Sequence, residues 1–451
     1  MNHPRTPIDR RRFLKITAAA GTGALALPTL IPRGVLAAPN QPGANERFVV
    51  AHIGVGGMGG THLQNMLRFQ KDGKVRIAAV CDCDDNRLEA AWNNVAQQAK
   101  PYRDYRYILE RKDIDAVLIA TPDHWHAIIT LAALRAGKDV YCEKPLTHNI
   151  HEAVEVMRAV DENKRVLQTG SMQRSSKEFR VACELVRNGA IGRVQRVACQ
   201  FGDAGVPCNL PGEAAEPGLD WNMWVGPAPL RDYNSVLSPR GNHSHFPNWR
   251  NYREFGGGMV TDWGAHHLDI AQWGLGMDDS GPVEVLPPEP GKKRGAKLVY
   301  ASGITVEHAN GFGVEFFGTE GVVQVNRGKF TFQRGTEMIA SFTGKKGDAK
   351  ESETSLAAEV QKADRGYLKD AKTRLYVSNN HISDFVQCVR ERRKPVASEQ
   401  VGGRTAICCH LMNLAYYHGQ RLQWDPARFT FTGGTGDPKW LTRDYRSPWK
   451  V

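Results

Sequence analysis

The sequence predicts an α/β protein in which a doubly wound parallel sheet is followed by an α+β domain with an open, mainly antiparallel sheet. Two observations support this prediction. From residue 48 to residue 168, short continuous apolar segments alternate with segments of helical periodicity. From residue 194 onward the pattern changes to strands joined by short turns, and then to helices.

Five strands are expected in the first half, at residues 48–53, 75–80, 116–120, 140–142 and 166–168. Helices are expected between them, at residues 59–69, 86–97, 126–135 and 150–163. The expected strands are short and apolar throughout. This is typical of a parallel sheet that helices cover on both faces.

The second half is expected to begin with a strand at 194–201 and a long loop at 203–257 that is rich in Pro, Gly and Trp. A loop of this length is usually functional or disordered, and its aromatic residues argue against disorder. These are Trp221, Trp224, Trp249, Tyr252 and Phe255. Beyond it we expect a helix at 261–275, strands at 298–308, 311–317 and 322–325, a polar exposed insertion at 343–375, and helices at 381–390 and 403–418.

A glycine-rich turn, Gly54-Val55-Gly56-Gly57-Met58-Gly59, connects the first strand to the first helix. Gly54 permits the tight turn, Gly56 lets a pyrophosphate approach the backbone, and Gly59 lets helix and strand pack closely. Asp82 ends the second strand, where a carboxylate accepts hydrogen bonds from ribose hydroxyls. We therefore predict a Rossmann domain that binds NAD, while the nearby Arg87 keeps NADP as an alternative.

The first 37 residues have the pattern of an export signal. Arg10-Arg11-Arg12-Phe13-Leu14-Lys15 precedes a weakly apolar run at 16–31, and Val35-Leu36-Ala37 suits cleavage. The twin arginines resemble the signal of the twin-arginine pathway, which exports folded proteins. We predict a periplasmic or otherwise exported protein. Its predicted parts are a signal peptide (1–37), an NAD(P)-binding domain (47–170), a substrate and oligomerisation domain (171–425) and a C-terminal tail (426–451).

Charge and cysteine content restrict the partners. The 451 residues have a net charge of +11, of which residues 1–37 carry +5 through six Lys/Arg and one acidic residue. The remainder holds no block of basic residues, so nucleic acid is not an expected partner. No later segment is long and apolar enough for a membrane span. The nine cysteines lack the spacing of a disulfide framework, which favours buried free thiols.

Further motifs follow strand ends on the sheet edge where ligands bind. Thr121-Pro122-Asp123-His124-Trp125-His126 follows the third strand, and Cys142-Glu143-Lys144-Pro145 follows the fourth. A lysine at that edge can act as a point charge or a proton donor, although an isolated lysine is usually a solvated surface charge. Asp262-Trp263-Gly264-Ala265-His266 comes soon after the glycine run 256–258, which lets backbone approach a ligand.

With these motifs, residues 47–420 resemble the Gfo/Idh/MocA oxidoreductase family, and Glu143-Lys144-Pro145 is the most specific part of the resemblance. The resemblance implies a Rossmann domain, a C-terminal sheet domain, sugar or polyol substrates, and a catalytic set of Lys144, Asp262 and His266. The predicted cofactor-binding residues are Gly54, Gly56, Gly57, Met58, Gly59, Asp82, Thr121, Pro122, His126, Glu143 and Lys144.

The residue chemistry agrees with the implied catalytic set. Asp262 and His266 are four residues apart on the expected helix, so they share a face. A carboxylate beside an imidazole raises the pKa of the imidazole and orients the ring. His266 is then the expected base for the hydroxyl proton, with Lys144 stabilising the developing alkoxide. The alternative for the Asp/His pair is a surface hydrogen bond or a helix cap.

Four residues are weaker candidates for substrate binding, namely Arg174, Trp249, Arg250 and His267. Asp262, His266 and Asp269 also share a helical face that suits a metal, and His243 and His245 are candidates to complete such a site or to line a sugar pocket. No further ligand is evident in the sequence, so we predict no bound metal.

We expect an NAD(P)-dependent oxidoreductase that acts by hydride transfer on a hydroxyl of a sugar, glycoside or polyol, and that forms a homo-oligomer. Outside the cytoplasm a freely exchanging cofactor would be lost, so a tightly bound, internally recycled cofactor is expected. One alternative is an NAD-requiring glycoside hydrolase or lyase that works by transient oxidation. Another is a non-catalytic sugar- or dinucleotide-binding protein, which would have no use for an acid/base set.

Overall fold

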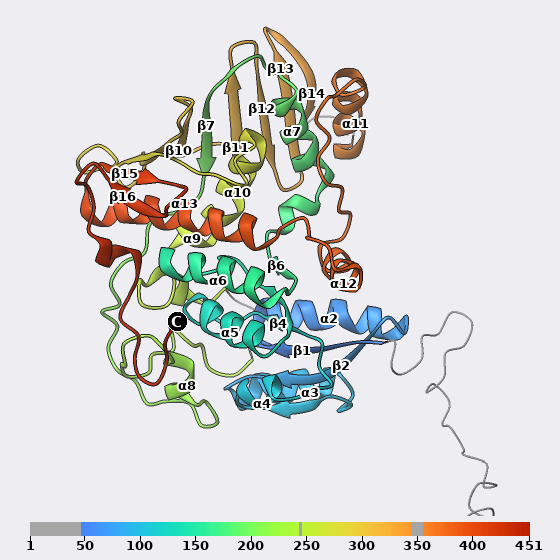
Figure 1. Cartoon of the computed structure of the whole chain (residues 1–451), viewed down its shortest axis with the longest axis vertical. Helices are drawn as coiled ribbons and strands as arrows, with labels where there is room; N and C mark the ends of the chain where they lie inside the picture. The colour runs from blue at the N-terminus through green and yellow to red at the C-terminus, as the bar shows by residue number, and fades with distance from the viewer. Residues whose placement is uncertain (1–46, 243–245, 345–354) are drawn as a thin grey trace, which may run out of the picture. The chain divides into compact units, whose positions relative to one another are not determined.

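The first half of the chain forms a six-stranded sheet in the computed structural model, which describes residues 47–242, 246–344 and 355–451 (Figure 1). All five strand pairs are parallel, which confirms the predicted doubly wound sheet. In spatial order the strands are β3 (Lys100–Tyr102), β2 (Val75–Cys81), β1 (Phe48–Ile53), β4 (Ala116–Ile119), β5 (Asp139–Cys142) and β6 (Leu167–Thr169). The sequence did not predict β3, because it has only three residues and contains a proline.

Helices connect these strands, and three of them begin one to three residues earlier than predicted. The helices are α2 (Gly57–Lys71), α3 (Asp85–Asn94), α4 (Arg106–Leu109), α5 (Asp123–Arg135) and α6 (Ile150–Asn163). The predicted start of α5 was residue 126, and the true start brings residues 123–126 into its first turn. Eleven of the 13 residues of α5 are buried, so it has no polar stripe that would mark its start in the sequence.

The second half forms a ten-stranded sheet (Figure 1). Only the pair β7–β10 is parallel, which confirms a mainly antiparallel sheet. In spatial order the strands are β14 (Glu337–Phe342), β13 (Lys329–Arg334), β12 (Gly321–Asn326), β11 (Val314–Gly318), β7 (Val194–Gln200), β10 (Thr305–Ala309), β9 (Lys297–Val299), β8 (Glu284–Leu286), β15 (Leu422–Asp425) and β16 (Thr430–Thr432). The predicted strand at 298–308 is therefore wrong as one element, since a turn at Ser302–Gly303 divides it into β9 and β10.

Most helices of the second half pack against this sheet or against α6, whereas α12 (His381–Glu391) packs its apolar face into the core of the parallel sheet, where Phe385 contacts Phe48 and Tyr141. These helices are α7 (Lys177–Arg187), α9 (Met259–Asp262), α10 (Gly264–Leu275), α11 (Leu356–Tyr367), α12 and α13 (Glu399–His418). Two predictions are corrected here. The expected helix at 261–275 is interrupted at Trp263, and the expected polar insertion contains α11, whose Val360 and Ala363 are buried.

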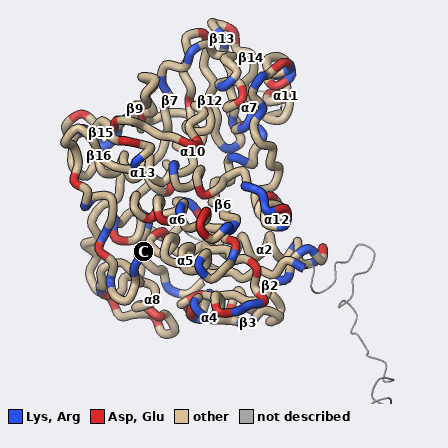
Figure 2. Tube along the Cα trace, in the orientation of Figure 1, with Lys and Arg blue, Asp and Glu red and all other residues tan. Residues whose placement is uncertain are grey.

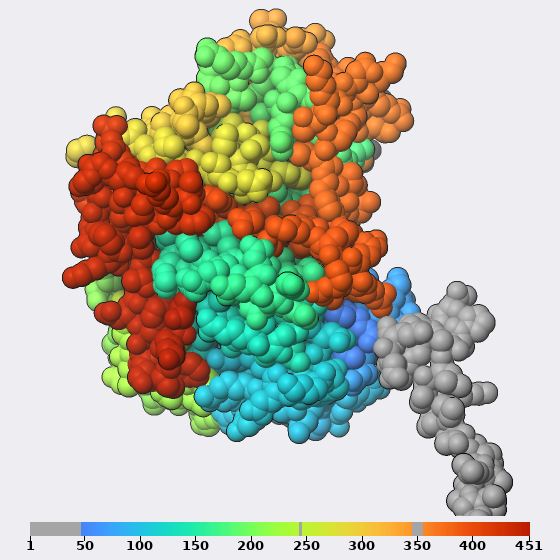
Figure 3. Space-filling view, in the orientation of Figure 1, coloured from blue at the N-terminus to red at the C-terminus, as the bar shows by residue number. Residues whose placement is uncertain are grey.

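The described parts of the long loop, residues 203–242 and 246–257, pack around an aromatic cluster, in agreement with the prediction that its aromatic residues argue against disorder. It contains α8 (Trp221–Val225) and a short 3-10 helix at Asn248–Asn251. The C-terminal segment, red in Figure 3, runs over the surface beside α5 and α6 and meets this loop. There the Nε of Arg446 donates a hydrogen bond of 2.8 Å to the carbonyl of Gly226. Trp449 packs edge-on against Trp125, with the ring centroids 4.7 Å apart. The chain terminus therefore supports the start of α5.

The free cysteines and the mixed distribution of charge agree with the sequence predictions. All nine cysteines are free, and seven of them are buried. None of the helices in the described residues has the length and apolar character needed to cross a membrane. Figure 2 shows Lys/Arg and Asp/Glu interspersed along the trace of the described residues. The predicted signal segment at 1–37 lies outside them.

One prediction concerns the C-terminal anchor. Glu152 of α6 is fully buried and accepts hydrogen bonds from Arg443 and Tyr445, at 3.1 and 3.0 Å. Arg443→Met should lower the free energy of unfolding by about 3–5 kcal/mol, because it leaves a buried carboxylate without its cation. Urea denaturation measures this.

Two further variants check the cause. Arg443→Met combined with Glu152→Gln should recover part of the lost stability, because the buried charge is then gone. Arg428→Met removes an exposed arginine near Asp425 and should change stability by less than about 1 kcal/mol. Equal losses in the single and double Arg443 variants would contradict the proposed anchor.

Candidate functional site

The glycine loop forms one wall of a cavity of about 650 Å³. Gly54 has a φ of +79°, and a Cβ there would lie 2.7 Å from the carbonyl oxygen of Ala120. A Cβ on Gly59 would lie 1.9 Å from the carbonyl oxygen of Gly54. Both positions therefore exclude any side chain, and the open cradle that results suits a pyrophosphate at the start of α2.

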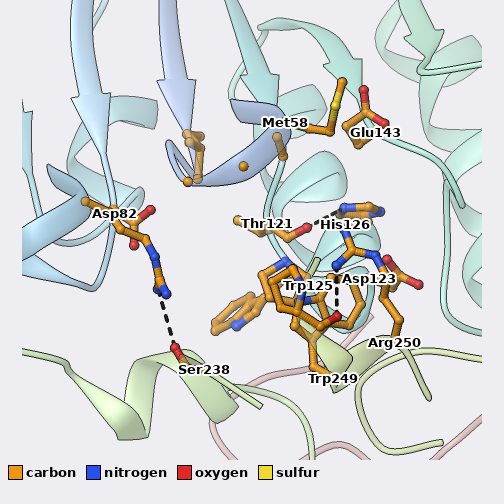
Figure 4. Close-up of a pocket in the computed structure, with 18 of the residues that line it drawn as sticks. Met58, Asp82, Thr121, Asp123, Trp125, His126, Glu143, Ser238, Trp249 and Arg250 are labelled. Atoms are coloured by element: carbon orange, nitrogen blue, oxygen red, sulfur yellow. Dashed lines mark hydrogen bonds between the residues drawn. The ribbon is translucent and has the colours of Figure 1, made fainter. Parts of the chain in front are cut away.

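Most predicted site residues meet at this cavity. Those that line it are Gly54, Gly56, Gly57, Met58, Asp82, Thr121, Pro122, His126, Glu143, Lys144, Trp249, Arg250, Asp262 and His266. Figure 4 shows that they approach from several segments, with Asp82 on one side and Glu143, Asp123 and Arg250 on the other. Gly59 lies behind the loop and packs helix on strand, which is the role predicted for it.

Asp82 comes directly after β2 and supports the glycine loop. Its Oδ2 accepts a hydrogen bond of 3.0 Å from the amide of Val55, and its Oδ1 accepts one of 3.1 Å from the amide of Asp84. Burial raises the pKa of Asp82, and the charge of Arg87 opposes this rise. The carboxylate therefore holds the loop in place at the same edge where a ribose would bind.

Glu143 and His62 form a buried pair behind the next motif. The Nε2 of His62 lies 2.6 Å from the Oε1 of Glu143, and both side chains are at most 6% exposed. Burial would raise the pKa of Glu143, but the hydrogen bond with His62 and the charges of His62 and Lys144 outweigh burial and lower it. This pair positions the segment that carries Lys144.

Asp262 joins two cations at the cavity. Its Oδ1 accepts a hydrogen bond of 2.8 Å from the Nζ of Lys144 and one of 3.1 Å from the Nε of Arg250. Its backbone carbonyl accepts another hydrogen bond, of 3.1 Å, from the Nζ of Lys144. Burial favours the neutral acid, but the charges and hydrogen bonds of both cations outweigh it and lower the pKa of Asp262. Asp262 is therefore an ionised carboxylate that pairs with both Lys144 and Arg250.

His266 behaves differently from the sequence prediction. Burial first, and then the charges of Lys144 and Arg327, lower the pKa of His266 well below 6.5, so the expected rise through Asp262 is wrong. Asp262 ends α9 and binds the two cations instead of the imidazole. The ring is therefore neutral at neutral pH. Its Nδ1 is buried without a hydrogen-bond partner among the residues that the structure describes.

His126 has a positioning role in this arrangement. Its Nδ1 lies 2.6 Å from the carbonyl oxygen of Pro145, and its Nε2 lies 2.9 Å from that of Thr121. Burial lowers the pKa of His126. The neutral ring therefore donates to one of these carbonyls and links the ends of β4 and β5, which both border the cavity.

Two predicted substrate residues do not reach the cavity. Arg174 is 2% exposed, and its Nε donates 2.9 Å to each carboxylate oxygen of Asp269, while Asp278 pairs with it as well. His267 turns its Nδ1 toward the carbonyl of Gln200. Asp269 is thus paired with Arg174. Among the described residues, three or more His, Cys, Asp or Glu side chains nowhere come together in a way that could hold a metal ion. His243 and His245 lie outside them.

Several residues of the cavity wall are absent from the site residues predicted from the sequence. Among them are Asp123, Trp125, Arg327 and Ser238. Asp123 and Trp125 belong to a motif that was noted, but their orientation depends on the early start of α5. Arg327 follows β12, and its guanidinium lies 4.7 Å from the ring centroid of Trp263. Its position depends on how the second sheet packs, and no local pattern marks it.

Residues 216–241, called here the covering segment, close the Asp82 side of the cavity. The amide of Asp220 donates 2.9 Å to the carbonyl of Cys83, and Arg103 donates 2.9 Å to the carbonyl of Gly218. The hydroxyl of Ser238, labelled in Figure 4, accepts a hydrogen bond of 3.4 Å from Arg87. The covering segment thus lies over the end of the crevice where the adenosine of a dinucleotide would bind.

The fold and the glycine loop together define an NAD-binding Rossmann protein with a second sheet domain. A family model described as "Oxidoreductase family, NAD-binding Rossmann fold" matches residues 48–171, and "Oxidoreductase family, C-terminal alpha/beta domain" matches residues 191–451. The chain belongs to the Gfo/Idh/MocA oxidoreductase family.

Individual relatives match in part. Inositol 2-dehydrogenase of Salmonella typhimurium is 34% identical over 142 residues, which cover 31% of this chain and 42% of that protein. The glycosyl hydrolase family 109 protein of Shewanella baltica is 25% identical over 206 residues, which cover 42% of this chain and 44% of that protein. The chain thus spans less than half the length of these curated relatives.

Solved structures share the fold. Levoglucosan dehydrogenase in complex with NADH and levoglucosan has a TM-score of 0.57 at 20% identity, covering 84% of this chain and 99% of that chain. Aldose-aldose oxidoreductase from Caulobacter crescentus has a TM-score of 0.56 at 19% identity, with the same coverage. At this level of identity the likeness shows the fold alone.

A prediction follows for Asp82. Asp82→Ala should weaken NAD binding to nucleotide-free protein by about 1.5–3 kcal/mol, because it removes a charged hydrogen-bond acceptor at the ribose and frees the loop at Val55. Titration calorimetry measures the affinity. Asp85→Ala is the matched control, since that neighbouring carboxylate is half exposed and does not line the cavity. Equal NAD affinities in wild type and Asp82→Ala would refute the assignment.

Proposed function

We propose that this protein is an NAD(P)-dependent oxidoreductase that transfers hydride at a hydroxyl-bearing carbon of a sugar, glycoside or polyol. The observation that carries the proposal is the group of Lys144, Asp262 and His266, which faces the glycine loop across one cavity. A binding protein would have no use for a cation and a neutral imidazole beside a cofactor cradle. The relatives named as inositol dehydrogenases support a polyol or sugar substrate.

The chain's own residues suit proton transfer at the substrate hydroxyl. A nicotinamide dinucleotide, when bound, supplies the hydride acceptor. Lys144 has three N–H donors and gives two to Asp262, so one remains for a substrate oxygen. His266 is neutral and can take the hydroxyl proton, while Lys144 stabilises the negative oxygen. Asp262 fixes the ammonium group of Lys144.

We further propose that the dinucleotide is retained and recycled within one protein. The covering segment supports this, because backbone and side-chain hydrogen bonds join it to residues 83–87 and to Arg103. These bonds hold the segment over the crevice and would slow the departure of a nucleotide beneath it. Such retention suits an exported protein, which we propose on the twin arginines at residues 10–11.

A second candidate is an NAD-requiring glycoside hydrolase or lyase that works by transient oxidation. The partial similarity to the Shewanella glycosyl hydrolase family 109 protein supports this second candidate. Product analysis separates the two candidates. Release of an aglycone from a glycoside without net NADH formation indicates hydrolysis or elimination, whereas a ketone product from a free polyol indicates net oxidation.

The catalytic assignment predicts the effect of two substitutions. Lys144→Met and His266→Ala should each lower turnover by at least about a hundredfold, the low end for acid–base catalysis, and should keep bound nucleotide. Lys369→Met and His151→Ala are matched controls on exposed residues and should keep full turnover. Because the pKa of His266 is lowered, the wild-type activity should decline only below pH 6.5 as acid protonates the base. Near-wild-type turnover in either variant removes that residue from the mechanism.

Retention predicts what purification will yield. Protein from the periplasmic fraction should already contain NAD or NADH that dialysis removes poorly, and Arg10→Lys with Arg11→Lys should keep the loaded protein inside the cell. Asn86→Ala with Arg103→Ala removes two side-chain bonds to the covering segment, worth about 0.5–1.5 kcal/mol each, and should speed nucleotide loss about tenfold. Nucleotide-free exported protein that works only with excess NAD would overturn recycling.

A further inference from the structure

Asp123 is a buried carboxyl group that the proposed mechanism does not use. It is the first residue of α5, it is 2% exposed, and it lines the cavity. Its Oδ2 is buried and has no hydrogen-bond partner in the part of the chain that the structure describes. Buried polar atoms are nearly always paired, and an unpaired one costs about 1–3 kcal/mol. An unpaired carboxyl oxygen that lines a cavity is expected to form its hydrogen bond with a bound ligand.

The nearby cations leave Asp123 without a partner because Asp262 takes both of them. Lys144 and Arg250 influence the charge of Asp123, yet each donates to the Oδ1 of Asp262, at 2.8 and 3.1 Å. Figure 4 shows Asp123 and Arg250 next to each other on the cavity wall. Of two neighbouring carboxyl groups, one therefore binds the cations and the other stays open.

Helix capping does not account for Asp123 either. An acid in the first turn of a helix usually accepts a hydrogen bond from a nearby amide or benefits from the helix dipole. No side chain caps α5, and the amide of His124 donates 3.2 Å to the carbonyl of Phe255 instead. Burial, followed by the charge of Asp262, raises the pKa of Asp123 well above 3.8. A protonated carboxyl group is both a donor and an acceptor, which matches the hydrogen-bonding needs of a hydroxyl group.

We propose that Asp123 binds a second hydroxyl of the substrate, apart from the one that faces Lys144 and His266, and thereby selects polyhydroxylated substrates over simple alcohols. This inference rests on the proposed function of the same cavity. Asp123 is then a specificity-determining residue, since it touches a hydroxyl that does not react. An orphaned carboxyl in the free protein becomes paired when the polyol binds.

The test compares Asp123→Asn, Asp123→Leu and wild type on myo-inositol, levoglucosan and D-glucose, together with monodeoxy analogues of the best substrate. KM for the full polyol should rise about tenfold in Asp123→Asn and further in Asp123→Leu, because only the amide keeps a donor and an acceptor. The value of kcat should change little. Wild type should discriminate against one deoxy analogue, and Asp123→Leu should lose that discrimination while nucleotide content stays the same.

Thermal unfolding separates binding from a structural role. Without polyol, both Asp123 variants should melt at the same temperature as wild type or higher, because an unpaired buried carboxyl is removed. Asp139→Asn is the matched control: that buried carboxylate accepts 2.8 Å from the amide of Val166 and pairs with Arg392, so its loss should lower Tm and leave KM unchanged.

Four outcomes would contradict the inference. Loss of nucleotide with an unchanged KM for polyol would show that Asp123 contacts the cofactor. A lowered Tm with unchanged KM and unchanged discrimination would show a structural role. If wild type is active and both Asp123 variants match it in every measurement, this inference alone is refuted. If wild type neither binds nor oxidises any polyol of the panel, the proposed function is refuted as well.

Discussion

The carboxylate of Asp262 is the interaction on which the rest of the site depends. It is buried, and it is ionised only because Lys144 and Arg250 lie within 3.1 Å of one of its oxygens. Lys144 follows the parallel sheet, Arg250 comes from the long loop, and Asp262 ends a short helix of the second half. A single ion cluster therefore connects all three parts. Removal of Asp262 would leave two cations without their carboxylate, and removal of both Lys144 and Arg250 would leave a buried carboxylate without compensation.

This cluster also explains the state of the groups around it. Burial lowers the pKa of His266, and the positive charges of Lys144 and Arg327 lower it further. Because the cations are already paired, Asp123 has none to bind. One polar network thus leaves a neutral imidazole and an unpaired carboxyl group facing the same space. Groups with shifted pKa values of this kind gather at functional sites.

Around this centre, irregular segments close the crevice of the parallel sheet. The covering segment lies over the Asp82 edge, and the C-terminal segment holds it in turn through Arg446. Trp125 is packed between the covering segment and Trp449, so the wall of the cavity is held from behind by the end of the chain. Chain regions without regular secondary structure are therefore part of the site's framework.

Local patterns in the sequence were sufficient for the parallel sheet, the glycine loop, Asp82 and Lys144. Alternating apolar strands and helices, a turn that tolerates only glycine, and polar residues at strand ends are recorded within a few neighbouring residues. The helix break at Trp263, the pKa of His266, the pairing of Arg174 with Asp269, the covering segment and the orphaned Asp123 were decided by the tertiary structure alone. Each depends on which distant charges and carbonyls are buried together, and desolvation and pairing energies are set by that three-dimensional neighbourhood rather than by residue spacing along the chain.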